Sequence, residues 1–195
     1  MKNKLKMICL AFTLCCTFMQ IANGAQPNNT TLEIVNFFNV AGALEQKMQA
    51  QLLQFRENHQ TAEEKMFEQT LTYFNKDAFS ARYATVFDKY LDADDIHAFK
   101  RFMVTPSGIK LANLLKNSDP QLSTSIDTLD LNDKKSVTEF FRSPVGVKTR
   151  QALDSPESHQ VWPQYFEDIM CMNASKNDVA TLNALKSQGK CRSIR

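Results

Sequence analysis

The sequence has few residues that interrupt a helix. Its 195 residues include only five glycines and six prolines, and no segment alternates apolar and polar side chains with the two-residue period of a β-strand. Apolar side chains instead recur every three or four residues through most of the chain, which is the spacing of one helix face. The sequence therefore predicts an all-α protein, a compact array of about nine or ten short helices without a β-sheet.

The sequence also lacks the common catalytic, nucleotide-binding and zinc-binding motifs. The chain has no G-x-S-x-G nucleophile motif, no P-loop and no G-x-G-x-x-G dinucleotide motif. Its three histidines, His59, His97 and His159, are far apart and form no H-E-x-x-H pair, so no zinc site is predicted. We therefore predict no cofactor and no enzymatic activity, and an envelope hydrolase assembled from distant residues ranks last among the alternatives.

One acidic cluster is typical of cation sites. It comprises Asp92, Asp94 and Asp95, but an EF-hand loop needs further oxygen ligands and a glycine at its sixth position, where this chain has Ile96 and His97. Helix capping by Asp92 and Asp95 explains the cluster better, and no metal is predicted.

The only long apolar run, residues 7–21, follows three lysines within the first six residues. It is shorter than the ~20 residues of a membrane span and is followed by A-N-G at residues 22–24, so residues 1–24 are predicted to be a signal peptide. Leu14 before Cys15 is a poor lipobox residue, which disfavours a lipoprotein. Residues 25–195 are then expected to form one helical domain without a membrane span, periplasmic or alternatively secreted.

Removal of a signal peptide would change the charge and the cysteine content. The full chain carries +2 at pH 7, but the mature chain would have 20 basic and 21 acidic residues, so nucleic-acid binding is not expected. Only Cys171 and Cys191 would remain, and they lack the C-x-x-C spacing of a redox pair. We predict a structural disulfide that closes a loop of about 20 residues and adds ~3 kcal/mol of stability.

An internal repeat organises the second half of the chain. Residues 91–115 recur 38 positions later as residues 129–153, without a gap and with eight of 25 positions identical. Each copy predicts a helix, a tight S/T-P-x-G turn and a second helix. The identical pairs are Leu91 and Leu129, Asp92 and Asp130, Asp95 and Asp133, Phe102 and Phe140, Pro106 and Pro144, Gly108 and Gly146, Lys110 and Lys148, and Leu115 and Leu153.

The repeated residues have structural explanations. An aspartate opens the first helix of each copy as its N-cap, and proline occupies the first position of the second helix. Gly108 and Gly146 are expected where helices approach closely at the corner, because glycine inside a helix otherwise costs ~1 kcal/mol. Lys110 and Lys148 are interpreted as solvated lysines whose stems cover apolar surface, with anion binding beside a helix N-terminus as the alternative.

The first copy carries a family resemblance. One motif in it is a tyrosine and a phenylalanine followed by L-D-x-x-D and F-x-x-[ST]-P-x-G-x-K. In this motif the chain resembles the bacterial exported family catalogued as domain of unknown function 2059. The similarity covers residues 77–120, although Phe102-Met103 replaces the family's usual aromatic-tyrosine pair and Thr105 its serine. It implies an exported, all-helical protein and brings no catalytic residue. The residues that carry it are Tyr83, Phe87, Tyr90, Leu91, Asp92, Asp95, Phe99, Phe102, Thr105, Pro106, Gly108 and Lys110.

Three further helix boundaries are predicted outside the repeat. Gly42 should separate two N-terminal helices, Trp162-Pro163 should kink or restart the helix that begins at Ser155-Pro156, and Asn177 should cap the last helix.

Aromatic residues offer the only sign of a binding role. Most of the 19 fall in residues 37–102 at helical spacing, which is typical of a core, although short Phe- and Met-rich helices can leave an apolar groove between them. We favour a non-catalytic exported protein that interacts with another protein or an envelope component. The alternative is a carrier or sensor of a small hydrophobic ligand, against which a fully packed interior would argue.

Overall fold

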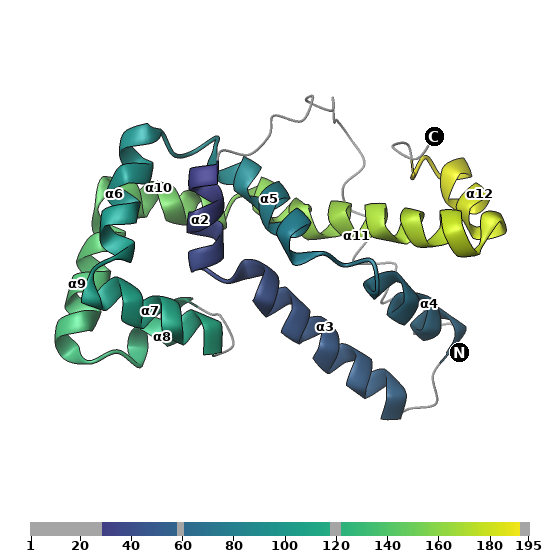
Figure 1. Cartoon of the computed structure of the whole chain (residues 1–195), viewed down its shortest axis with the longest axis horizontal. Coiled ribbons are helices and arrows are strands. Elements are labelled where there is room, and N and C mark those ends of the chain that lie inside the picture. Colours follow the sequence, from purple (N-terminus) through teal and green to yellow (C-terminus); the bar gives the residue numbers. More distant parts are fainter. Residues whose placement is uncertain (1–28, 58–60, 118–121, 192–195) are drawn as a thin grey trace.

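The computed structural model describes residues 29–57, 61–117 and 122–191. The predicted signal peptide and His59 lie outside this range. The described residues contain helices and no strand, which confirms the all-α class (Figure 1). The helices are α2 (Asn29–Phe37), α3 (Val40–Glu57), α4 (Ala62–Leu71), α5 (Lys76–Phe87), α6 (Ala93–Met103), α7 (Pro106–Asn117), α8 (Leu122–Asp127), α9 (Leu131–Arg142), α10 (Pro144–Leu153), α11 (Pro156–Asn177) and α12 (Val179–Ser187).

The two sequence copies form two helix pairs that also pack against each other. The first copy supplies α6 and α7, and the second supplies α9 and α10. The first helix of each copy packs against the second helix of the other, α6 against α10 and α9 against α7. These helices gather at one end of the molecule with α2 beside them, and α11 leads away toward α4 and α12 (Figure 1).

Equivalent phenylalanines meet where the copies join. The rings of Phe102 and Phe140 stack with centroids 3.9 Å apart and planes 4° apart. Phe99 meets Phe140 edge-on at 5.2 Å. Phe37 at the end of α2 and Phe38 just after it meet Phe99 at 5.4 and 5.7 Å. Because these rings are buried or nearly so, most of the aromatic residues serve as core.

Each copy also provides ion pairs to the other. Lys110 of the first copy contacts Asp130, at 3.0 Å, and Asp133 of the second copy. Lys148 of the second copy contacts Asp92 at 3.1 Å and also Asp95 in the first. The acidic cluster is thus a helix cap that contacts the lysine of the other repeat, and the second copy has an equivalent cap.

These contacts shift the pKa of both partners. A backbone hydrogen bond from Asp95 and the Lys148 ammonium lower the pKa of the Asp92 carboxyl. Equivalent contacts from Asp133 and Lys110 lower that of Asp130. The facing carboxylates raise the pKa of Lys110 and Lys148 above the ordinary lysine value.

A double variant tests the stability provided by these pairs. Depressed carboxyl pKa values stabilise the fold above the unfolded value near 3.9, and this stability is lost as pH falls toward the folded value. Raised lysine pKa values stabilise it below about 10.4, and this stability is lost as pH rises through the folded value. We expect Lys110→Gln/Lys148→Gln to lower the melting temperature by a few degrees between these limits, and the deficit should shrink as pH falls below about 3.9.

Lys89→Gln is the matched control, because Lys89 is exposed and has no ion pair among the described residues. An equal deficit for the double variant at pH 2 and pH 7 would contradict the assignment.

Glycine is required at the corner of each copy. The Thr105 hydroxyl donates to the Phe102 carbonyl at 2.7 Å and accepts from the Gly108 amide at 3.0 Å, and Ser143 does the same for Phe140 and Gly146. A Cβ atom on Gly108 would overlap the Phe102 carbonyl oxygen. The close approach is therefore between a helix start and the last turn of the helix before it.

Asp95 and Asp133, the second aspartates of the two caps, have different hydrogen-bond partners. Asp133 accepts a hydrogen bond of 2.6 Å from the Ser107 hydroxyl, and both residues are buried. The residue equivalent to Ser107 in the second copy is Val145, which has no hydroxyl to offer Asp95. The two aspartates are thus held by different partners, because Asp95 accepts instead from the Asp92 amide at 3.1 Å.

Helix α11 is longer than predicted. It runs from Pro156 to Asn177 with Pro163 inside it, so the fresh start at Trp162-Pro163 is wrong. Pro163 lies on the exposed side, where water can satisfy the freed carbonyl of the exposed His159. Buried side chains on the opposite face continue through this point, and their packing holds the helix together: Val161, Tyr165 and Ile169.

The C-terminal helix is attached by a disulfide. Cys171 and Cys191 are bonded, with Cα atoms 5.4 Å apart. Gly189, with φ 78°, follows the C-cap of α12, and the Lys190 amide donates to the Leu185 carbonyl at 3.0 Å. The cap of α12 is Asp178 rather than the predicted Asn177.

The break between α2 and α3 lies before the predicted one. Asn39 adopts φ 51°, a left-handed conformation that asparagine tolerates, and α3 begins at Val40. Gly42 lies within the first turn of α3. The Asn39 side chain also donates to the Leu115 carbonyl at 3.2 Å, which ties the break to the end of α7.

Candidate functional site

An open cleft of about 770 Å³ lies between α3, α5, α7, α10 and α11. Nine of its fourteen lining residues are apolar or aromatic. We call it the apolar cleft, and its volume is within the range of about 300–1,000 Å³ that is usual for small-molecule sites. It is lined by Phe38, Val40, Ala43, Leu44, Lys47, Phe79, Tyr83, Leu115, Arg150, Leu153, Asp154, Ser158, His159 and Trp162.

The floor and walls of the cleft are built differently. Phe38, Phe79 and Leu115 are buried in the main core and form a fixed floor. Leu44 from α3 and Leu153 from α10 are half-buried, so their side chains leave apolar surface accessible in the walls. A ligand entering the cleft would therefore meet apolar groups that water contacts in its absence.

Trp162 is the only tryptophan of the chain and is half-buried in one wall. Its ring meets Phe74 and Phe79 at centroid distances of 6.2 Å and Phe166 at 5.3 Å. These neighbours fix the indole so that part of it faces the cleft. The tryptophan fluorescence of the protein therefore comes from a residue in the wall of this cleft.

The polar lining residues of the cleft are mostly exposed. Lys47, Arg150, His159 and Asp154 are all exposed, and the described residues provide no ion pair to any of them. At the floor, burial raises the pKa of the Tyr83 hydroxyl, which a hydrogen bond with Ser158 partly offsets. The tyrosine is therefore a neutral group at physiological pH.

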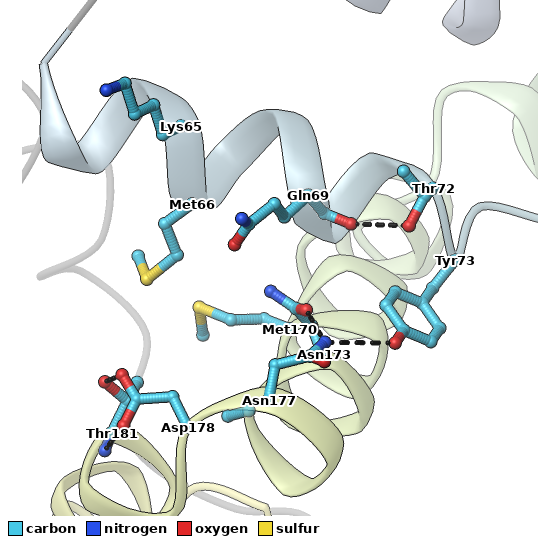
Figure 2. A pocket seen from close by; sticks show the side chains of 11 residues that line it. Lys65, Met66, Gln69, Thr72, Tyr73, Met170, Asn173, Asn177, Asp178 and Thr181 are labelled. Carbon is cyan, nitrogen blue, oxygen red and sulfur yellow. Dashed lines mark hydrogen bonds between the residues drawn. The ribbon is translucent and has the colours of Figure 1, made fainter.

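A second groove, of about 790 Å³, lies between α4, α11 and α12 (Figure 2). Met66 and Met170 project into it from opposite sides. Its amides already bond to one another, since Asn177 donates to the Tyr73 hydroxyl at 3.2 Å and to the Asn173 side-chain oxygen at 2.8 Å. We call it the methionine groove.

The repeat residues singled out in the sequence all serve the fold. Lys110 and Lys148 are neither unpaired solvated lysines nor available to bind an anion, because each contacts two carboxylates. In the described part of the chain, no three histidine, cysteine or acidic side chains come together in a way that could hold a metal ion. Across those residues, no helix is long and apolar enough to cross a membrane.

Comparisons with protein-family models, with curated proteins and with solved structures gave no match to this chain. The resemblance to the exported family stays a prediction, and functional inference rests on the geometry of the molecule.

The cleft residues were not singled out as a site from the sequence. They come from five helices between residues 38 and 162, so no local spacing connects them. Leu44, Phe79 and Trp162 each belong to an ordinary helical stripe. The only usable signal was the aromatic content, which predicted both a core and a possible groove.

Proposed function

We propose that this protein is a non-catalytic binding protein and that the apolar cleft holds a small hydrophobic ligand. The observation that carries the proposal is the cleft's apolar wall, because Leu44, Leu153 and Trp162 keep accessible surface beside a rigid aromatic floor. Burial of such surface by a ligand contributes about 25 cal/mol for each Å² removed from water. The sequence favoured a protein-interaction role, and the cleft shifts the preference to its alternative.

Export to the periplasm is part of the same proposal. The Cys171–Cys191 disulfide is compatible with an oxidising compartment, and the predicted signal peptide would direct the chain there. A carrier of hydrophobic molecules needs no catalytic group, which agrees with the predicted lack of enzymatic activity.

Titration with 1-dodecanol, followed by Trp162 fluorescence, tests the proposal. We expect saturable binding by the parent, and Leu44→Glu to weaken it about tenfold or more, because a carboxylate would replace apolar wall. Leu53→Glu is the matched control, since Leu53 is on the same helix, 61% exposed and outside the cleft. A fluorescence that does not respond, or binding that Leu44→Glu leaves intact, would refute the proposal.

Interaction with another protein or an envelope component is the second candidate, and the methionine groove favours it. Met66 is 38% exposed and faces Met170 across the groove, and flexible thioether side chains adapt to varied apolar partners. Native mass spectrometry of the protein isolated from its host separates the two candidates. A small added mass supports the carrier, whereas a co-purified protein whose binding Met66→Glu abolishes supports the interaction role.

A further inference from the structure

We infer that the ligand of the apolar cleft is a monomeric anionic amphiphile, a single alkyl chain that ends in a carboxylate. This inference rests on the proposed function and adds the chemistry of the head group. The cleft combines an apolar interior with a polar rim whose charge is predominantly positive. An amphiphile matches both parts in one molecule.

The charge of the rim comes from two different helices. Lys47 projects from α3 and Arg150 from α10, and both line the cleft. The one carboxylate in the lining is Asp154, so the two cations exceed it by one charge. His159 adds a ring N–H that can donate a hydrogen bond whether or not the imidazole is charged.

These cations differ from the lysines of the repeat. Lys110 and Lys148 are each held by two carboxylates, whereas no described carboxylate pairs with Lys47 or Arg150. The rim cations therefore keep their hydrogen-bonding capacity for a ligand. Arg150 can hold a carboxylate through two parallel N–H donors, and Lys47 adds a second positive charge to the lining of the same cleft.

The interior of the cleft determines where the alkyl chain of the ligand lies. The only polar groups at its floor are the neutral Tyr83 hydroxyl and the Ser158 hydroxyl, which donates to the Ala152 carbonyl at 2.5 Å. A charged group placed at the floor would find no counter-ion among the described residues there. The head group therefore belongs at the rim and the alkyl chain against Leu44, Leu153 and Trp162.

Three probes with one alkyl chain and different head groups test the inference: dodecanoate, 1-dodecanol and dodecyltrimethylammonium, each below the concentration at which it forms micelles. We expect dodecanoate to bind about tenfold more tightly than 1-dodecanol, and the cation to bind most weakly. Lys47→Gln/Arg150→Gln should weaken dodecanoate binding about tenfold and change 1-dodecanol binding less than about twofold. Lys47→Arg should retain tight binding, because the positive charge remains.

Arg142→Gln is the matched control, since Arg142 is exposed on α9 and lies outside the cleft. Equal affinity for dodecanoate and 1-dodecanol would overturn the anionic head group and leave the proposed function standing. No response to any probe would overturn both. Binding to vesicles of phosphatidylglycerol without binding of dodecanoate would overturn the monomeric ligand.

Discussion

Gly108→Leu is expected to lower the free energy of unfolding by about 3 kcal/mol, measured by urea denaturation. The new Cβ would overlap the Phe102 carbonyl oxygen, which belongs to the backbone and cannot rotate away. A gain in helix propensity of about 1 kcal/mol would offset only part of this loss. Gly146→Leu should behave in the same way, because its Cβ would meet the backbone of Phe140 and Phe141.

Gly42→Ala separates corner packing from a general sensitivity of the chain to loss of glycine. The atoms nearest a Cβ at Gly42 belong to the Asn39 side chain, which can move at the cost of its bond to the Leu115 carbonyl. A smaller loss is expected there than at Gly108. Unfolding of Gly108→Leu at the parent's urea concentration would show that the corner has room for a side chain.

Loss of the disulfide should have an effect of similar size, confined at first to one end. Cys171→Ser/Cys191→Ser is expected to cost about 3 kcal/mol, since a loop with a sequence separation of 20 would no longer be closed in the unfolded chain. The cluster that holds α12 is small, with Ala174 and Leu185 as its other buried members. Hydrogen exchange in α12 should therefore rise before exchange in the repeat does.

The reduced parent protein provides the control for the disulfide. A reducing agent should bring the parent to the stability of the double serine variant and leave that variant unchanged. Equal stability of the oxidised parent and the variant would mean that α12 is held by packing alone.

Features set by neighbouring residues were predictable from the sequence. Asp92 and Asp130 cap their helices as expected, and Ser143-Pro144 and Ser155-Pro156 start theirs, because a cap needs only the backbone three residues on. The all-α class follows from the same local periodicity. The pairing of Cys171 with Cys191 needed only the count of cysteines left after the predicted signal peptide.

Features set by packing were not predictable. Pro163 should have ended a helix by its own chemistry, but buried side chains on the other face carry α11 past it. The lysine contacts depend on α6 lying against α10 and on α7 lying against α9, which no spacing within one copy reveals. The apolar cleft is harder still, because its lining spans five helices whose arrangement follows from the whole core.

The reciprocal packing of the two copies makes the repeat resemble a homodimer in one polypeptide. The equivalent Phe102 and Phe140 stack on each other, and each copy supplies a lysine to the carboxylates of the other. A short tether gives such a pair an effective concentration in the millimolar range, so association is hardly limited by diffusion. During synthesis, however, Lys148 is made after the first copy is complete. The cap formed by Asp92 and Asp95 therefore lacks its counter-ion until most of the second copy has been made.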